Sequence, residues 1–500
     1  MQKPLEGLLV VALEQAVAAP FCTMRLADAG ARVIKLERPE GDFGRGYDDV
    51  AMGQSSYFVW LNRGKESVVV NLRAQEDRSL FEALVAKADV FVHNLKPGAL
   101  ERIGYNIDAL CRENRRLIAC SISGYGETGP MAQRKAYDLL VQAESGLASI
   151  TGGPSEAARV GFSIVDIATG AVAVQAVLEA LYGRTVTGKG THIRLSMFDT
   201  IVEWMAVPFL HAAQGRPPKR IGLAHPSIAP YGVFRSGDGK PILISIQNER
   251  EWVALCERVL GDAALLSDQR FCSNVARVQN REATDARVAA GFAVLASSEL
   301  VERLTQADIA FAFVNEIADI VGHPQLHTIP IATPGGVLDV PAPAPIWAEG
   351  ERRYGSVPAL GAHSHSVRQE IAAKGRRREA GQNSRIMGKT VGTETPSEPL
   401  SQEEPMTLKQ TFAEYLKSQT DVWRAQIKDY EAQLGNTGAE TRARYEKAVA
   451  EMQARAEEAR KLLEQVKSTN EVAWKDMQGA TRKAFADLQK GWADALSRFQ

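Results

Sequence analysis

Cysteine and histidine are too few and too scattered to build a metal or disulfide framework in this chain of 500 residues. The five cysteines are an odd number without a CxxC spacing, and the eight histidines show no HExxH spacing. A zinc site or a paired disulfide framework is therefore disfavoured, and free thiols fit a reducing compartment. We expect a cytoplasmic protein without a metal centre.

An excess of charge of one sign and a long apolar run are also missing. The 59 Lys and Arg residues balance 60 Asp and Glu residues, so the net charge of −1 excludes a globally basic nucleic-acid-binding protein. No uninterrupted apolar run approaches the ~20 residues that span a membrane. The apolar run at residues 8–13 stops at Glu14, too early for a signal peptide. We expect neither a nucleic-acid partner nor a membrane span.

Proline is absent from the C-terminal part, since none of the 22 prolines lies beyond Pro405. Residues 375–405 have the polar composition of a disordered linker. Residues 406–500 are predicted to form a separate helical domain. Its apolar residues are spaced alternately by four and three, as in a coiled coil. This stripe comprises Tyr445, Val449, Met452, Ala456, Ala459, Leu463 and Val466, and the spacing continues through Ala473, Met477, Ala480 and Ala484.

A second apolar set lies earlier in this tail, from Phe412 to Leu434, and the glycine-containing sequence 434–438 separates it from the stripe. The two segments are predicted to form a helical hairpin that buries its apolar residues against itself or a partner. In its general sequence pattern the tail resembles phasin-like, coiled-coil bacterial proteins, which implies an oligomerisation partner or a granule-surface partner.

Residues 1–374 alternate short apolar runs with amphipathic stretches, which predicts an α/β fold with a parallel sheet. The predicted strands are residues 8–13, 33–36, 68–72, 90–92 and 117–122, and the predicted helices are 20–29, 75–86 and 137–147. After His225 the pattern changes to a hairpin followed by helices. We therefore predict a large domain at 1–219, a smaller α+β domain at 220–310, and a return to the large domain at 311–374.

Two nucleotide-binding motifs are nearly matched, and both fail on context. Residues 183–189 begin like a P-loop, but Gly190 replaces the hydroxyl residue that would hold magnesium, so a simple turn is predicted. Residues 124–129 match GxGxxG after a predicted strand, but Pro130 follows and no helix opens there. A glycine-rich loop against some ligand is left open.

Polar residues gather directly after the predicted strands. In an open parallel sheet, ligands bind outside the carboxyl ends of the strands, so these side chains are expected to line one crevice. The basic ones among them would suit a phosphate-bearing ligand, although each of these residues taken singly is better explained as a solvated loop residue. The set is Gln15, Glu37, Arg38, Arg73, Asn94 to Gly98, and Arg102 on the helix beyond.

Asp166 stands among apolar residues where a long Ala- and Val-rich helix is predicted to begin. Locally, this acid is either the N-cap of that helix or a carboxylate in a water-poor ligand pocket. Gly170 and Ala171, one turn later, would let a ligand approach the helix closely. The local sequence leaves both interpretations open.

Many short motifs, in a fixed order over three quarters of the chain, match one known family. The matching stretches are residues 4–7, 19–21, 30–39, 62–67, 94–98, 124–130, 137–138, 166–170, 187–190, 230–232 and 358–363. On these stretches, residues 1 to about 370 resemble the family III CoA-transferases, the group that includes formyl-CoA transferase and the α-methylacyl-CoA racemases.

The resemblance implies covalent catalysis, with Asp166 as the nucleophile and Gln15 close to the reacting acyl group. It also implies a Rossmann-like large domain, a smaller domain, and a homodimer whose subunits thread through each other as interlinked rings. A CoA thioester is the expected substrate, and no tightly bound cofactor is needed. The family's CoA contacts fall on Arg38, Arg73, Asn94, Ala99, Arg102 and Lys135.

The racemase branch of this family has a histidine where this chain has Tyr137, so the transferase branch is favoured. The sequence is most similar to members acting on dicarboxylic acids, such as succinyl-CoA:glutarate, itaconate or mesaconate transferases. A dicarboxylic acid needs a cation for its remote carboxylate, for which Arg63 or His225 is a candidate. The alternatives are an acyl-CoA racemase and a noncatalytic CoA-binding scaffold that presents the helical tail.

Overall fold

The computed structural model describes residues 3–348, 350, 352–373 and 439–470, with isolated positions between 413 and 428 and between 473 and 492. The chain divides into two compact units, Met1–Lys389 and Thr390–Gln500, which are described separately below. The predicted linker at 375–405 lies outside the described residues.

The first unit is built on a six-stranded sheet in the order β3-β2-β1-β4-β5-β6, and every neighbouring pair in it is parallel. This is the strand order of a Rossmann fold, with its topological switch point between β1 and β4. The predicted α/β parallel sheet is therefore confirmed. The strands are β1 (Leu9–Leu13), β2 (Arg32–Glu37), β3 (Lys65–Val69), β4 (Val90–His93), β5 (Ile118–Ser123) and β6 (His192–Ser196).

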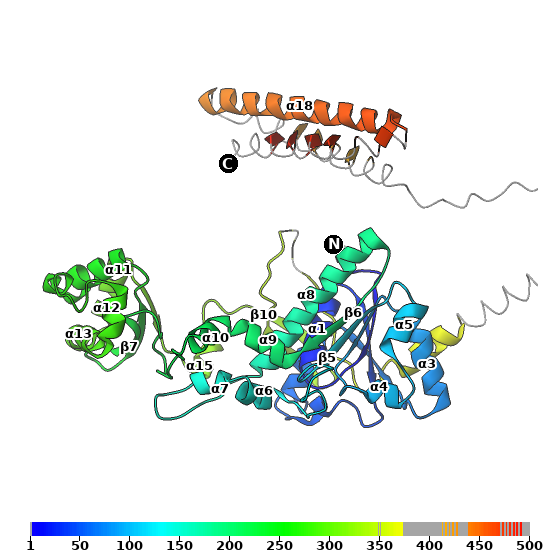
Figure 1. Cartoon of the computed structure of the whole chain (residues 1–500), viewed down its shortest axis with the longest axis horizontal. Helices are drawn as coiled ribbons and strands as arrows, with labels where there is room; N and C mark the ends of the chain where they lie inside the picture. The colour runs from blue at the N-terminus through cyan, green and yellow to red at the C-terminus, as the bar shows by residue number, and fades with distance from the viewer. Residues whose placement is uncertain are drawn as a thin grey trace, which may run out of the picture. The chain divides into compact units, whose positions relative to one another are not determined.

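Helices cover both faces of this sheet (Figure 1). Because side chains alternate along a strand, Val10 and Ala12 of β1 face one layer, while Val11 and Leu13 face the other. The first layer holds α1 (Ala18–Asp28), α6 (Asp138–Glu144), α8 (Ile164–Thr187) and α9 (Met197–Trp204). The second holds α3 (Gln75–Val85), α4 (Ala99–Arg102) and α5 (Ile107–Glu113). Shorter helices complete the domain: α2 (Ser56–Leu61), α7 (Leu147–Ile150), α10 (Ala206–Ala213) and a 3-10 turn (Phe43–Gly46).

Helix α8 is held along its whole length by the domain. Gly170 is buried so closely on α1 that a Cβ there would lie 2.6 Å from the carbonyl oxygen of Ala18. Its close approach therefore serves helix packing, and the expectation that Gly170 admits a ligand is wrong. Near the other end, buried Arg184 donates to the Asp89 carboxylate at 2.9 Å and to the carbonyl oxygen of Arg116 at 2.8 Å.

Among the described residues, α8 alone is long and apolar enough to cross a membrane by length and composition, with a mean hydropathy of 1.7. The search for uninterrupted apolar runs missed it, because Asp166, Glu179 and Arg184 divide its sequence. Its buried side chains join the core beneath α1 and the sheet, as expected for the central helix of an α/β domain.

Two strands differ from the local predictions, and one predicted turn is confirmed. Strand β3 begins at Lys65 and not at Val68, because buried Lys65 occupies a strand position that an apolar pattern cannot reveal. Strand β6 was missed, since His192 and Arg194 interrupt its apolar pattern. The turn predicted instead of a P-loop is confirmed: Gly188 ends α8 in the left-handed conformation at φ 68°.

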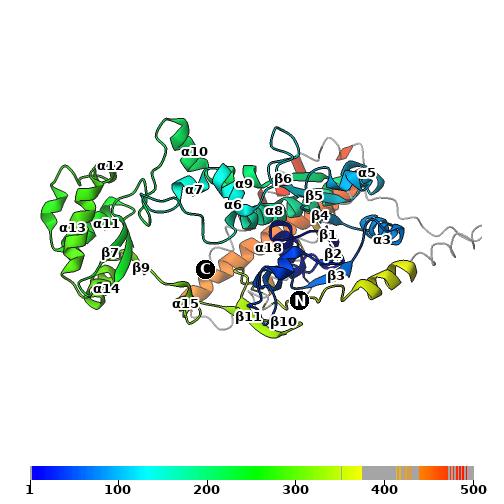
Figure 2. The same ribbon diagram turned by 90° about the horizontal axis from the view of Figure 1, so that it is seen from below.

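The smaller domain has a three-stranded antiparallel sheet of β7 (Tyr231–Arg235), β8 (Pro241–Ser245) and β9 (Ala310–Phe313). Figure 2 shows its helices gathered beside this sheet. Since β9 pairs with β8, the small sheet extends past the predicted boundary at residue 310. The helical segments are α11 (Glu249–Ala254), a π-helical turn (Leu255–Leu260), a 3-10 turn (Ala263–Leu266), α12 (Asn274–Gln279), α13 (Arg281–Ala293) and α14 (Ser297–Gln306).

After β9 the chain forms α15 (Ile317–Ile320) and the hairpin β10 (Thr328–Thr333) and β11 (Gly336–Pro341). Ile331 of this hairpin packs against Phe58 and Val59 of α2, which returns the chain to the large domain. Residues 364–373 then form a helix whose Val367 joins the core under the second helical layer.

The second unit contains α18 (Ala439–Ser468) and further helical positions before and after it. The predicted stripe is buried at Val449, Met452, Ala456, Ala459, Leu463 and Val466, in one cluster with Leu416, Trp423, Trp474, Phe485 and Trp492. Its predicted continuation is wrong: α18 ends at Ser468, and the side chain of Asn470 caps a new turn at Ala473. Ala480 and Ala484 are exposed beyond this break. The coiled-coil and hairpin assignments stay predictions.

Candidate functional site

Two adjoining cavities open along the carboxyl ends of the parallel strands. The outer cavity, of about 490 Å³, is lined by residues that follow β1, β2 and β3. The inner cavity, of about 580 Å³, is lined by residues from β1, β4, β5 and the start of α8. Gln15 and Leu95 border both, so the cavities form one crevice at the topological switch point.

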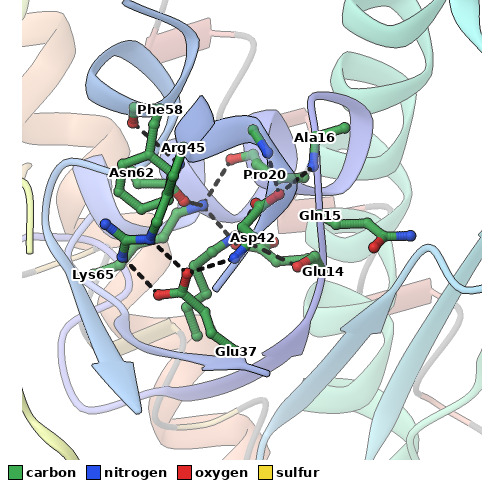
Figure 3. A network of polar contacts seen from close by, with 12 residues as sticks. Glu14, Gln15, Ala16, Pro20, Glu37, Asp42, Arg45, Phe58, Asn62 and Lys65 are labelled. Atoms are coloured by element: carbon green, nitrogen blue, oxygen red, sulfur yellow. Dashed lines mark hydrogen bonds and ion pairs between the residues drawn. The ribbon is translucent and has the colours of Figure 1, made fainter. Parts of the chain in front are cut away.

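Gln15 and Asn94 are tied together at this switch point. The Gln15 N–H donates to Asn94 Oδ1 at 3.0 Å, and Asn94 Nδ2 donates to the Gln15 carbonyl oxygen at 2.8 Å. This reciprocal pair joins the ends of two strands that neighbour each other in the sheet. Figure 3 shows the Gln15 side chain pointing away from the polar network beside it. Asn94 therefore fixes the Gln15 main chain and leaves its amide available to a ligand.

Behind the crevice wall lies a buried network of ion pairs (Figure 3). Glu14 Oε1 lies 2.7 Å from Lys65 Nζ and 3.4 Å from Lys35 Nζ, and all three side chains are fully buried. Burial by itself raises the pKa of Glu14, but the two lysines bring it below its ordinary value. Burial also lowers the pKa of Lys65 to about 8. Glu14 is thus an ionised, structural acid despite its position beside Gln15.

The same network fixes the backbone where the crevice begins. Lys35 Nζ pairs with Asp42 at 2.8 Å, and the other oxygen of Asp42 accepts from the Ala16 N–H at 3.0 Å. Ala16 has a φ of 60°, a left-handed conformation that a non-glycine residue adopts at a cost in free energy. Glu37 binds Arg45 in a bidentate pair, which outweighs its burial and lowers its pKa to about 2.

Asp166 has a different environment from these acids. It lies in the first turn of α8, after the N-cap Ser163. Asp138 of α6 caps that turn: its Oδ1 accepts from the N–H groups of Val165 at 2.7 Å and Asp166 at 3.3 Å. The interpretation of Asp166 as the N-cap is therefore wrong. Asp138 Oδ2 accepts from Gln142 at 2.6 Å, so this buried acid is well satisfied.

The Asp166 carboxylate borders the inner cavity, and no ion pair or hydrogen bond from another described residue stabilises it. Burial raises its pKa to about 7, and the negative charge of Asp138 adds to the effect. The N-terminus of α1 opens onto the same cavity at Val17 and Ala18, without a side-chain cap. Its backbone N–H groups offer positive potential where a negative charge would develop.

Cations line the rest of the crevice. Arg38 and Arg73 border the outer cavity, both exposed and without an ion pair to another described residue. Lys96, Arg134, Lys135 and Arg159 border the inner one. Arg134 pairs with Glu144 at 3.5 Å, whereas Arg159 bonds only the carbonyl oxygen of Val160 among the described residues. This arrangement can hold a phosphate-bearing ligand in the outer cavity and carboxylates in the inner one.

The sequence of residues 5–364 matches the family model described as CoA-transferase family III. The chain belongs to this family. It is 37% identical over 377 residues to the acetyl-CoA:oxalate CoA-transferase of Acetobacter aceti, which covers 74% of this chain and 96% of that protein. It is 33% identical over 379 residues to the succinyl-CoA:glutarate CoA-transferase of Mus musculus, which covers 74% of this chain and 86% of that protein.

Among solved structures, a CAIB/BAIF family protein from Brucella suis is 35% identical and superimposes with a TM-score of 0.64. That match covers 74% of this chain and 100% of the other. The prediction of a family III CoA-transferase is thus confirmed. The second unit lies outside the matched residues 5–364.

The crevice of this family III CoA-transferase gathers most of the predicted site residues. Gln15 borders both cavities, Arg38 and Arg73 border the outer one, and Asn94, Lys135 and Asp166 border the inner one. Ala99 and Arg102 line neither cavity; they are the first and last residues of α4, which begins directly after the loop that does. The roles assigned to these residues stay predictions.

Both candidates for holding a remote carboxylate are wrong. Arg63 is buried and binds both oxygens of Asp28, at 3.0 and 2.6 Å, so its charge is already used. His225 stacks on Tyr231 beyond the crevice, and burial and Arg281 lower its pKa, which disfavours the cationic form. The glycine-rich loop also has a structural explanation, because a Cβ on Gly124 would lie 2.0 Å from Ala136 Cβ.

Sequence reasoning missed two residues of the site. Arg159 precedes the helix of Asp166 in an irregular segment, where no strand or helix pattern draws attention to it. Asp138 lies in a matched motif, but only its contact with α8 reveals that it caps the helix and raises the pKa of Asp166. The described residues hold no group of three or more His, Cys, Asp or Glu side chains arranged for a metal ion.

Proposed function

We propose that this family III CoA-transferase moves CoA from an acyl-CoA, such as succinyl-CoA, to a dicarboxylic acid through covalent intermediates on Asp166. One observation carries the proposal: Asp166 borders the inner cavity as a carboxylate with a raised pKa and without a cationic partner among the described residues. A carboxylate without hydrogen-bond donors keeps its electron pairs available for attack.

The first half of the reaction opens the donor thioester. An Asp166 oxygen attacks the thioester carbonyl, the carbon–sulfur bond breaks, and CoA leaves as a thiolate from a mixed anhydride. The thiolate then attacks the Asp166 acyl carbon, which releases the donor acid as a carboxylate and leaves an aspartyl-CoA thioester. The uncapped N-terminus of α1 and the Gln15 amide lie on the cavity wall, where they support the negative charge of each tetrahedral intermediate.

The second half repeats these steps in reverse. The acceptor carboxylate attacks the aspartyl thioester and displaces the thiolate, which forms a second anhydride. The thiolate attacks the acceptor carbonyl of this anhydride, which produces the new acyl-CoA and restores the Asp166 carboxylate. No net proton transfer or redox change is needed. The CoA moiety is proposed to extend into the outer cavity, with Arg38 and Arg73 facing its phosphates.

A dicarboxylic acceptor fits the cations of the inner cavity. One carboxylate reacts at Asp166, and the other needs a cation whose charge is not already neutralised. Arg159 meets this requirement among the described residues, because it borders the same cavity and has no acidic partner. The relatives whose names include oxalate and glutarate support the same class of acceptor.

We also propose an interlocked homodimer. Helices α8, α9 and α10 expose several large apolar side chains, an arrangement that is expensive in water and typical of a covered face. They are Leu178, Tyr182, Val186, Trp204, Val207, Phe209 and Leu210. Sedimentation velocity should give a dimer mass, and a monomer at micromolar concentration would contradict this part of the proposal.

The test of the chemistry is to trap the covalent intermediate. Wild-type protein incubated with succinyl-CoA and no acceptor should carry a CoA adduct on the peptide that contains Asp166, as measured by mass spectrometry. Asp166→Ala should carry none. Transfer that survives in Asp166→Ala, or an adduct on another residue, would overturn the mechanism.

The acceptor class is tested by Arg159→Gln, with Arg112→Gln on an exposed face of α5 as the matched control. Loss of one charge-assisted contact should raise KM for dicarboxylic acceptors roughly tenfold, because such a contact contributes about 1.5 to 3 kcal/mol. KM for a monocarboxylic acceptor should stay unchanged. An equal loss with both acceptor classes would contradict the assignment of Arg159.

A further inference from the structure

A third cavity, of about 260 Å³, lies behind the inner cavity, which is called the catalytic cavity below, and shares part of its wall. We call it the rear cavity. The shared residues are Leu95, Lys96, Pro97, Ile122 and Ser123, at the ends of β4 and β5. The catalytic mechanism uses no side chain that lines the rear cavity alone. Its lining includes His93, Ser121, His192 and Asp108.

These four side chains form one continuous hydrogen-bonded relay. Ser121 Oγ lies 2.8 Å from His93 Nε2 and 2.8 Å from His192 Nε2. His192 Nδ1 lies 2.9 Å from Asp108 Oδ1. His93 and Ser121 are register partners on β4 and β5, and His192 lies on the next strand, β6. The relay therefore crosses three strands and ends on α5.

The relay has one self-consistent direction. The Leu95 N–H donates to His93 Nδ1 at 3.4 Å, so the neutral His93 ring carries its proton on Nε2. Burial lowers the pKa of His93 to about 4, with His192 adding to the effect, which keeps the ring neutral. Nε2–H then donates to Ser121, the Ser121 hydroxyl donates to His192 Nε2, and His192 Nδ1–H donates to the Asp108 carboxylate.

The relay also reaches the segment that follows β5, which borders the catalytic cavity. Asp108 pairs with Arg194 at 3.0 Å, and Arg194 pairs with Glu127 at 2.8 Å. Glu127 belongs to the glycine-rich segment that follows β5, whose first residue, Gly124, lines the catalytic cavity. At its other end, His93 directly precedes Asn94, whose side chain holds Gln15.

We propose that Ser121, His93 and His192 are positioning residues: their relay fixes from behind the two loops whose front sides bind the acyl-CoA. The loops concerned are residues 94–98 and 124–127. The relay acts through the backbone at Leu95 and through the Asn94–Gln15 pair, and none of its side chains touches the reacting atoms.

The order serine, histidine, aspartate also occurs in serine hydrolases, so a nucleophilic Ser121 is the competing interpretation. Two observations favour positioning. Ser121 lies inside a strand with 2% of its surface exposed, and its oxygen already accepts from His93. A nucleophile needs access to its substrate carbonyl and an oxygen lone pair directed at it.

The activity test compares Ser121→Ala with Ser121→Thr, which keeps the hydroxyl. Ser297→Ala is the matched control, because it removes a buried hydroxyl bonded to Asp238 at 2.7 Å in the smaller domain. We expect KM for acyl-CoA to rise roughly tenfold in Ser121→Ala, because misplaced loops lose contacts made in concert. Ser121→Thr should restore most of it, and Ser297→Ala should lower only thermal stability. Equal kinetics in Ser121→Ala and Ser297→Ala would overturn the proposal.

This inference rests on the proposed function only for its kinetic readout, so a second measurement is independent of turnover. Long-range 1H–15N spectra of histidine-labelled protein, assigned with His93→Asn and His192→Asn, should show the proton of His93 on Nε2 and that of His192 on Nδ1. The opposite tautomers would overturn the relay. Labelling of Ser121 by a fluorophosphonate would also overturn it, in favour of the nucleophile. If the protein shows these tautomers but has no transferase activity, the result contradicts the proposed function and not the relay.

Discussion

Two kinds of acid lie around the same crevice, and their pKa values are shifted in opposite directions. Glu14 and Glu37 are buried behind the crevice wall, yet their pKa values lie below the ordinary range, at about 2 for Glu37. Asp166 lies on the cavity itself, and its pKa is raised to about 7. Burial acts in the same direction on all three. What differs is the presence of Lys35, Lys65 and Arg45 against the first two.

The comparison teaches that burial alone does not identify a reactive acid. An ion-paired carboxylate is deeply stabilised as an anion and reacts poorly, since its lone pairs are directed at its partners. A carboxylate whose only charged neighbour is another acid is the one that can attack. In this chain the ion-paired acids Glu14 and Glu37 belong to the scaffold, and Asp166 is the acid proposed to react.

Removal of the unpaired acid should have the largest effect on activity. Asp166→Ala should lower kcat by at least a factor of ~10³, as expected when a covalent nucleophile is deleted. Stability should not fall at pH 8. The pKa of Asp166 is raised on folding, so the ionised acid destabilises the fold increasingly as pH rises from about 4 through 7.

The measurement combines steady-state kinetics with denaturant unfolding at two pH values. Asp199→Ala is the control, because Asp199 is also a first-turn acid but is exposed on α9. If Asp166→Ala is inactive because it is unfolded, Asp166 is needed for stability as the ion-paired acids are, and the comparison is contradicted.

Removal of a paired acid should instead reduce stability. Glu37→Gln leaves Arg45 without its bidentate partner and should lower the free energy of unfolding by about 3 kcal/mol at pH 7. Since the pKa of Glu37 is lowered from 4.5 to about 2, its stabilisation is complete above pH 4.5 and is lost as pH falls toward 2.

Urea unfolding at pH 7 and at pH 2 to 3 checks this result. Glu66→Gln is the control, because the Arg32–Glu66 pair is partly exposed and should contribute less than about 1 kcal/mol. Similar losses in the two variants, or a loss independent of pH, would contradict the distinction.

A smaller effect is expected when the pKa of Asp166 is moved toward its ordinary value and its carboxylate is kept. Asp138→Asn keeps the oxygen that caps α8 but removes the negative charge that helps to raise the pKa of Asp166. The rise of kcat/KM with pH, which should have its midpoint near 7 in the wild type, should move down by about one unit. An unchanged midpoint would mean that the ionisation of Asp166 does not control the rise of kcat/KM with pH.

The smallest effect is expected from removing the second unit. Residues from Thr390 onward lie outside the family match at residues 5–364. A chain that ends at Lys389 should keep kcat/KM within a factor of about two, measured beside the full chain. Its mass in solution or its localisation should change if the tail is an interaction module. A loss of soluble transfer activity would assign the tail a part in the reaction.

Much of the fold could be predicted from the apolar pattern. The strands around Val10, Val33 and Val90 are continuous apolar runs because both of their faces are covered by helices. The pattern failed where a strand carries buried or interrupting polar groups, as at Lys65 in β3 and at His192 in β6. The partners of these polar groups are distant in sequence, Glu14 for Lys65 and Asp108 for His192, which a local pattern cannot show.

The candidate site was predictable in its location but not in its electrostatics. The ends of parallel strands indicated Gln15, Arg38 and Asn94, and the family motif indicated Asp166. The failure of Arg63 as a candidate and the role proposed for Arg159 depend on which cation already has a partner. That information exists only in three dimensions, in the Arg63–Asp28 pair and in the cavity that Arg159 borders.

Helix α8 is anchored at both ends, by Asp138 at its first turn and by Arg184 near its last. With 24 residues it spans about 36 Å, so it acts as a rigid strut whose position the sheet sets. The position of Asp166 is therefore set by a rigid helix packed on the sheet. Loops and the smaller domain could differ to admit other acids without moving the proposed nucleophile, so that one chemistry would be retained while substrates are exchanged.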